Sequence, residues 1–156
     1  MASKRKTNAL KQKEKQMSKK YSHINSNGTG CQMVVMPFEA WNGEEGSVKF
    51  SFYPQKGVIQ YNDDDCMVFF CTPEDVARMV AVFRGMQENI DDGKGLRRLG
   101  SIMNLEHTIN PNGYRFTIIE KVDNGTKSLS IMLSTYEAME LSLALEGIMG
   151  KLVFGM

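Results

Sequence analysis

The sequence predicts an α+β fold made of two similar halves, each a small antiparallel sheet followed by one helix. Several short segments alternate between apolar and polar residues, which is typical of strands with one buried face. Two longer segments carry a helix-capping residue followed by apolar residues three and four apart, the pattern of an amphipathic helix. The 156 residues are enough to form one such domain with a hydrophobic core.

The first half contains four strand candidates and one helix. The clearest strand runs from Ser47 to Tyr53, where Val48, Phe50 and Phe52 share one face. The other candidates are 32–38, 58–61 and 66–71, with turns at 42–46, 54–57 and 62–65. Thr72 is a favourable N-cap and Pro73 suits the first helical position, so a helix is expected to begin there. Its apolar stripe is Val76, Met79, Val80, Phe83 and Met86.

The second half repeats this plan. Strands are expected at 102–109, 114–119 and 129–133, with turns at 110–113 and 122–127. Ser134 then opens a helix, and Glu137 completes a capping box. The apolar stripe of this helix is Ala138, Leu141, Leu145 and Ile148. Aligning Thr72 with Ser134 superposes the two helix stripes, which indicates an internal duplication of a ββββα unit over about 31–91 and 96–156.

Charge is distributed unevenly along the chain. Residues 1–20 contain eight Lys/Arg and one Glu, whereas the rest contains eleven Lys/Arg and seventeen Asp/Glu. We therefore expect a disordered basic tail over residues 1–30 and a single mildly acidic domain over 31–156. The tail, including Lys19 and Lys20, is expected either to contact a polyanion or to act only as a solubilising segment.

Several protein classes do not fit the sequence. No stretch approaches the roughly 18 apolar residues that cross a bilayer, and the lysine-rich N-terminus lacks the apolar core of a secretory signal. We expect a cytoplasmic protein, associated with a nucleoid or acting in a phage-infected cell. The three cysteines, Cys31, Cys66 and Cys71, match no metal or redox spacing and are expected to be reduced thiols.

No catalytic arrangement is evident, so we expect a protein that is not an enzyme and uses no cofactor or metal. His107 lies in a predicted strand and has no local partners for a triad. The run Asp63 to Asp65 could attract a divalent cation, but a solvated turn explains it better because no further carboxylates lie at ligand spacing. The glycines at 93, 95 and 100 do not have the spacing of a dinucleotide-binding motif.

The segment from Gly46 to Tyr61, read together with Val68 to Val76, resembles the central part of the plant Whirly proteins. Further similar segments are 93–98, which resembles their inter-repeat linker, 110–117, which resembles a hairpin entering a Phe-rich strand, and 133–138 with 150–155, which resemble their last helix and apolar tail. The likeness covers about residues 32–156. One segment departs from it: Whirly proteins carry a lysine-rich motif where this chain has Gln32 to Met36, and the preceding basic tail is expected to substitute.

The resemblance implies two antiparallel sheets packed through their helices, and binding of single-stranded DNA with little sequence specificity. RNA is kept as an alternative ligand. It also implies a homo-oligomer, a tetramer in that family, and the apolar run 147–154 is the expected subunit contact.

A sheet surface that mixes aromatic and cationic residues suits single strands, because bases stack on rings while Lys and Arg contact phosphates. The candidate residues are Lys49, Tyr53, Gln60, Tyr61, Arg97, Arg98, Arg115 and Lys121, with Lys19 and Lys20 from the tail. Trp41 could stack on a base or anchor a loop in the core. The acidic body favours a different function, a protein-interaction or assembly module such as a transcription accessory factor or a structural subunit of a viral or ribosomal particle.

Overall fold

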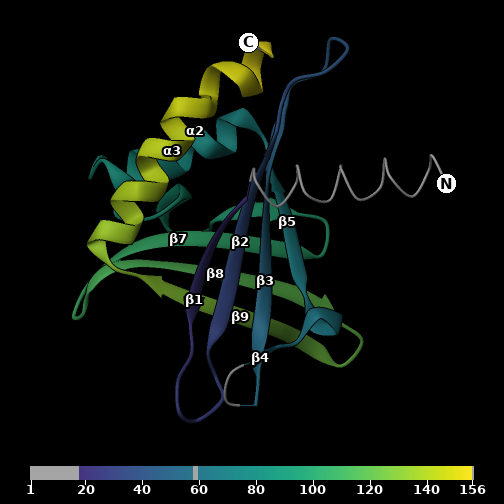
Figure 1. The fold of residues 1–156 in the computed structure, drawn as a ribbon, viewed down its shortest axis with the longest axis vertical. Coiled ribbons are helices and arrows are strands. Elements are labelled where there is room, and N and C mark those ends of the chain that lie inside the picture. The colour runs from purple at the N-terminus through teal and green to yellow at the C-terminus, as the bar shows by residue number, and fades with distance from the viewer. Residues whose placement is uncertain (1–17, 58–59, 156) are drawn as a thin grey trace, which may run out of the picture.

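The computed structural model describes residues 18–57 and 60–155. These residues form two antiparallel sheets with two α-helices at one end (Figure 1). The first sheet contains β1 (Lys19–His23), β2 (Cys31–Phe38), β3 (Ser47–Lys56), β4 (Gln60–Tyr61) and β5 (Met67–Cys71). The second contains β6 (Leu96–Arg98), β7 (Ser101–Ile109), β8 (Asn112–Val122) and β9 (Gly125–Leu133). Helices α2 (Pro73–Phe83) and α3 (Thr135–Phe154) follow the two sheets, and short 3₁₀ turns occupy Asp63–Asp65 (η1) and Asp91–Gly93 (η2).

The two halves share one plan, as the sequence predicts. In the first sheet β1 pairs with β2, β2 with β3, and β3 with β5, while the short β4 pairs with the end of β3. In the second sheet the order is β6-β7-β8-β9. The first sheet therefore places five antiparallel strands ahead of a helix, with β4 only two residues long, and the second places four. The α+β class and the pseudo-duplicated ββββα repeat are confirmed.

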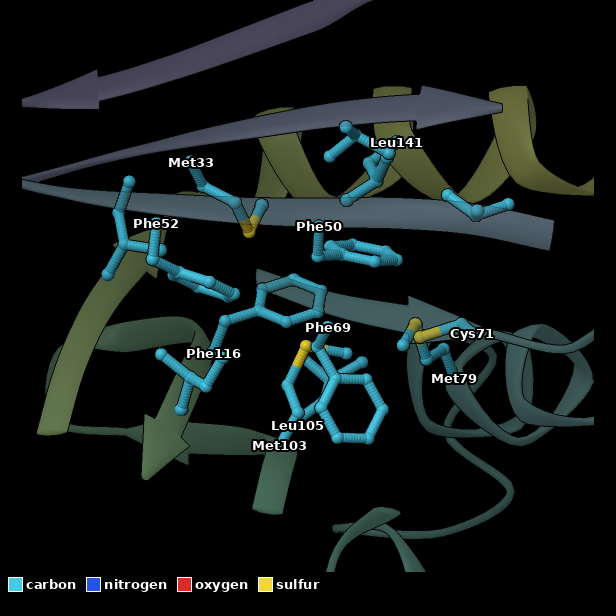
Figure 2. Close-up of a cluster of buried hydrophobic side chains, with 14 of the residues drawn as sticks. Met33, Phe50, Phe52, Phe69, Cys71, Met79, Met103, Leu105, Phe116 and Leu141 are labelled. Atoms are coloured by element: carbon cyan, nitrogen blue, oxygen red, sulfur yellow. The ribbon is translucent and has the colours of Figure 1, made fainter. Parts of the chain in front are cut away.

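The hydrophobic core lies between the two sheets. Figure 1 shows their strands crossing steeply, and Figure 2 shows the buried side chains that fill the space between them. Phe50 of the first sheet stacks on Phe116 of the second at a ring-centroid distance of 5.6 Å. Both rings are fully buried. The two helices contact each other, and the sheets also pack directly: the period-two alternation gives each sheet one apolar face, and the two faces bury each other.

Both helices begin at the predicted caps. Thr72 and Asp75 form one capping box, and Ser134 and Glu137 form the other. Of the stripe predicted for α2, Val76 and Met79 are buried and Val80 and Phe83 are partly buried. Val82, which the prediction did not include, is also buried, whereas Met86 lies beyond the helix end and is 73% exposed. Gly85, with φ 76°, follows the C-cap and ends the helix before Met86. In α3 the predicted Ala138, Leu141 and Leu145 are buried, and the helix continues through the expected apolar tail to Phe154.

Two segments expected to be irregular are strands. Order begins before Cys31, because Lys19–His23 forms β1 beside β2. This strand is held by buried Tyr21, whose hydroxyl donates to Glu140 of α3 at 3.0 Å. The expected linker at 93–98 likewise includes β6, which is anchored by buried Leu96. The expected disorder of residues 1–17 falls outside the described residues. No helix in the described part of the chain has the length and hydrophobicity needed to span a membrane.

Candidate nucleic-acid interface

The outward face of the first sheet carries lysines among apolar and aromatic side chains. Because Phe50 and Phe52 point inward, their neighbours Lys49, Ser51 and Tyr53 belong to the outer phase of β3. Lys49 is paired across the sheet with Met36 on one side and Phe70 on the other. Phe70 is 52% exposed, and its ring centroid lies 6.4 Å from that of Phe38. An open aromatic pair thus lies beside a lysine that has no ion-pair partner among the described residues.

The distribution of charge makes this face cationic. Strands β1, β2, β3 and β5 contain four lysines, of which Lys20 and Lys49 lie on the outer face, and no Asp or Glu. Strands β6 to β9 contain five Lys/Arg and two Glu. The fifteen other acidic residues of the described chain lie in helices, turns and loops. The acidic body inferred from the sequence is therefore not acidic on its sheets.

Tyr53 lies on this outer face but is half-buried. Its hydroxyl contacts the thiol of Cys66 and the hydroxyl of Ser51. Burial, followed by the Cys66 contact, raises the pKa of Tyr53, and the hydrogen bond with Ser51 offsets part of that rise. The neighbouring Cys66 thiol also has a raised pKa, mainly because of burial. Tyr53 therefore offers part of one ring face and stays protonated at neutral pH.

The two predicted residues of β4 lie at the far end of the sheet. Gln60 is exposed and pairs with Lys56, whereas Tyr61 pairs with Gln55 and is only partly exposed. The Tyr61 hydroxyl is buried and makes no hydrogen bond within the described residues. Tyr61 is therefore less available for stacking than a solvent-facing strand position would be.

A second cationic surface lies on the outer face of the second sheet. Arg97 and Lys121 are both exposed and line a cleft of about 240 Å³ with Ser101 and Thr126. Neither side chain has an acidic partner among the described residues. Arg115 shares this face, but its guanidinium donates to Glu106 at 3.1 Å, so part of its charge is already neutralised.

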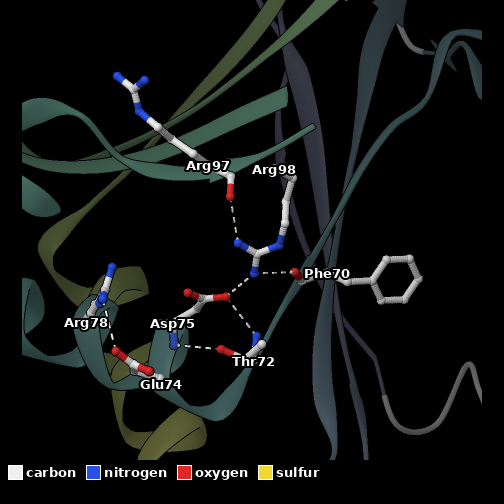
Figure 3. Close-up of polar contacts among 7 residues, drawn as sticks. All are labelled: Phe70, Thr72, Glu74, Asp75, Arg78, Arg97 and Arg98. Atoms are coloured by element: carbon white, nitrogen blue, oxygen red, sulfur yellow. Dashed lines mark hydrogen bonds and ion pairs between the residues drawn. The ribbon is translucent and has the colours of Figure 1, made fainter. Parts of the chain in front are cut away.

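Two candidates instead have structural roles. Arg98 points inward, where it pairs with the largely buried carboxylate of Asp75 and donates to the Phe70 carbonyl at 3.3 Å (Figure 3). Its guanidinium also lies 5.0 Å from the ring centroid of Phe69. Lys19 points toward α3 and pairs with Glu140 at 3.1 Å. Lys20, in the opposite phase, is exposed beside Val34 on the outer face.

The sheet packing therefore divides the ten candidates among different places. Lys20, Lys49 and Tyr53 share the outer face of the first sheet, which we call the first-sheet face together with Phe38 and Phe70. Arg97, Arg115 and Lys121 share the outer face of the second sheet, which points the other way. Gln60 and Tyr61 are at an edge, and Lys19 and Arg98, although partly exposed, are held in ion pairs with Glu140 and Asp75. The sequence analysis missed Phe38 and Phe70 because the apolar run in β5 has no alternation to show that Phe70 points outward.

Within the described residues, the cysteines and carboxylates do not form a catalytic or metal site. Burial raises the pKa of the Cys31 thiol to about 12 and that of Cys71 well above its usual value, so both are unreactive. In the described ranges no three His, Cys, Asp or Glu side chains gather closely enough to hold a metal ion. Asp65 instead pairs with Lys127 at 2.5 Å, which joins η1 to the second sheet. Trp41 is 82% exposed, so it is not an anchor in the core.

The fold is that of the Whirly proteins. The structure of WHY1 from Arabidopsis thaliana matches with a TM-score of 0.65 and 19% identity, over 88% of this chain and 86% of that one. The plant transcriptional regulator PBF-2 matches with a TM-score of 0.69 and 19% identity, over 86% and 82%. A guide-RNA-binding protein complex bound to a guide RNA matches at 0.65 and 12%, over 84% and 88%. No family sequence model and no curated protein sequence matches the chain.

Proposed function

We propose that this protein binds single-stranded nucleic acid on the first-sheet face, with little sequence specificity, and that it protects or organises single-stranded DNA. The observation that carries the proposal is the exposed Phe38–Phe70 pair beside Lys49, on a sheet whose strands contain no acidic residue. Rings accept bases of any identity, and lysines contact phosphates without reading sequence. A duplex offers no unstacked base faces to such a surface.

The structural neighbours are consistent with this class of ligand. The Whirly resemblance implies single-stranded DNA, and another neighbour is a guide-RNA-binding complex. Nothing on the first-sheet face is arranged to recognise a 2′-hydroxyl in particular, so RNA should also bind. The Arg97–Lys121 cleft, on the opposite face, would serve as a second phosphate contact for a strand that passes around the molecule.

The proposal is tested by titrating a fluorescent mixed-sequence single strand with the protein at two salt concentrations. Phe70→Ala should remove a base stack, about 1–3 kcal/mol, which weakens binding roughly 5- to 150-fold. Lys49→Gln should weaken binding mainly at low salt and reduce the log–log salt slope by about 0.7. A blunt-ended duplex should bind more weakly than the single strand to every folded variant.

Matched controls separate this surface from general effects. Met86→Ala removes from a turn an apolar side chain that is even more exposed than Phe70, and Lys94→Gln removes an exposed lysine just after η2. Both controls should bind like the parent. Equal binding by Phe70→Ala, Lys49→Gln and the parent would refute the first-sheet face, and preference of the parent for duplex would refute the function.

We further propose that the protein is a homo-oligomer that associates through α3. The helix is apolar on more than one side: Leu141, Leu145 and Leu152 are buried, while a second stripe is exposed. The exposed residues are Tyr136 (82%), Met139 (61%), Leu143 (62%) and Phe154 (70%). Met139 and Leu143 also line a groove of about 360 Å³ with Phe83 and Tyr114. Association with a second copy of the chain is the simplest way to bury this exposed apolar stripe.

Light scattering after size-exclusion chromatography tests this association. Leu143→Glu places a charge on the exposed stripe without disturbing the core, so a folded protein of monomer mass is expected. Ala144→Glu, at an exposed neighbouring position, should keep the mass of the parent. A parent protein of monomer mass would refute the proposal.

A further inference from the structure

A groove of about 570 Å³ lies at the tip of the β2–β3 hairpin, beside the end of α3 and away from the first-sheet face. Figure 1 shows this hairpin projecting past the sheets next to the C-terminal end of the chain. Trp41 and Phe154 supply its large apolar side chains, and they are 82% and 70% exposed. An exposed Trp ring beside an exposed Phe ring is typical of a surface that binds a partner.

The groove is held in a fixed shape. Trp41 and Glu44 exchange two backbone hydrogen bonds of 3.0 Å around Asn42 and Gly43. The φ angles of Asn42 and Gly43, 52° and 82°, are those of a tight hairpin turn of the Asn-Gly type. Behind the turn, the Ala40 N–H donates to the Lys151 carbonyl at 3.0 Å, which ties the hairpin to α3. The Trp41 ring is therefore presented by a rigid frame rather than by a free loop.

The charge around the groove is negative. Glu44 and Glu45 line it, and neither carboxylate has an ion-pair partner among the described residues. Glu39, next to the lining residue Ala40, pairs with Lys151 at 3.7 Å, and in the described chain no Lys or Arg lines the groove itself. These carboxylates repel phosphates, so the groove does not suit a nucleic acid. An aromatic ring flanked by carboxylates suits Lys and Arg side chains.

We propose that the groove binds the chain's own basic N-terminal segment, residues 1–17. This segment contains six Lys/Arg and one Glu. It lies outside the described residues, but its attachment point is known: Lys19 pairs with Val35, so the described chain starts at the hairpin end of β2. From Met36 to Trp41 the strand covers about 17 Å at 3.3 Å per residue. Random-coil statistics for 17 residues give an end-to-end distance of roughly 20–25 Å, which is more than the distance to the groove.

The tether makes even a weak contact effective. A short covalent tether gives two tethered groups an effective concentration on the order of millimolar. A lysine engaged by Glu44 or Glu45 is not free for a phosphate. A polyanion should therefore compete with the groove for the segment and release it, whether or not nucleic acid is the natural ligand.

Trp41 is the single tryptophan of the chain, so its fluorescence in the full-length protein reports on this groove alone. When the segment occupies the groove, acrylamide should quench Trp41 fluorescence less efficiently than it would quench a tryptophan that is 82% exposed. Replacing Lys11, Lys13 and Lys15 by Gln should remove this protection. Replacing Lys56, Lys94 and Lys121 by Gln, three exposed lysines of the body, should leave it unchanged. Salt of about 1 M shortens the Debye length to about 3 Å and should also remove it.

Inorganic polyphosphate should raise the acrylamide quenching of the parent protein to that of the variant with Gln at positions 11, 13 and 15. In the parent protein, carbodiimide should cross-link Lys11, Lys13 or Lys15 to Glu44 or Glu45. Equal quenching of the parent and this variant at low salt would overturn the proposal. Protection that depends on protein concentration would also overturn it, since it would identify a second copy as the occupant. None of these measurements uses nucleic acid, so failure of the proposed function would leave the outcome unaffected.

Discussion

Two adjacent arginines allow a sharp test of the structure, because Arg97 and Arg98 point to opposite sides of β6. Arg98 pairs with Asp75, whose side chain is 10% exposed, and lies against the Phe69 ring. Arg97 is exposed and has no acidic partner in the described chain. Arg98→Ala should therefore reduce stability, whereas Arg97→Ala should reduce only nucleic-acid binding.

The magnitude follows from the burial of the pair. Removing Arg98 leaves a largely buried carboxylate without its cation, which costs about 1–3 kcal/mol. The loss is smaller than for a fully buried pair because the Arg98 side chain is 40% exposed and the Asp75 carboxylate still accepts the Thr72 N–H at 2.9 Å. Loss of the ring contact adds roughly 0.5–1 kcal/mol. For a chain of this size, about 2 kcal/mol lowers Tm by roughly 4–8 °C.

Urea denaturation and thermal melting of the two variants measure this difference, and the single-strand titration measures binding. Arg97→Ala should melt within about 0.5 kcal/mol of the parent, as most exposed substitutions do. It should lower the log–log salt slope by about 0.7, while folded Arg98→Ala should keep the slope of the parent. Equal melting temperatures for the two variants, or a reduced salt slope in Arg98→Ala, would refute the assignment of Arg98 to the fold.

Three further outcomes are expected. Phe116→Ala should destabilise the protein by about 3–5 kcal/mol in urea denaturation, because it empties the centre of the packing between the sheets, whereas Phe70→Ala on the outer face should change stability little. The pKa of Glu137 lies below its usual 4.5. Burial alone would raise this pKa, but the hydrogen bond from the Ser134 N–H and the contact with His23 lower it by more. Its contribution to stability is complete above the unfolded-state pKa and is lost as the pH falls through the folded-state pKa, so Glu137→Gln should flatten the decline of Tm in acid. Gly46→Ala should lower Tm by the equivalent of about 1–3 kcal/mol, because the new Cβ would lie 2.2 Å from the Phe38 carbonyl oxygen; an unchanged Tm would contradict the observed hairpin geometry.

Local sequence patterns predicted most elements because the forces behind them are local. The alternation from Ser47 to Tyr53 defined the buried and outer phases of β3, and the capping boxes at Thr72 and Ser134 located both helix starts. β1 was missed because its only buried residue is Tyr21, which is held by Glu140 more than a hundred positions away. A strand stabilised by one distant contact leaves no local pattern.

The sequence by itself determined the α+β class, the internal repeat and the presence of cations on the predicted strands. The tertiary structure decided which of those cations remain available, because this depends on how the two apolar faces meet. Burying Phe50 against Phe116 directs Lys49 and Arg115 to opposite sides of the molecule, and it turns Arg98 inward toward Asp75 while Arg97 stays in solvent. The register between β3 and β5 places Phe70 beside Lys49. Cross-strand neighbours and sheet–sheet contacts join residues distant in sequence, so only the folded chain brings them together.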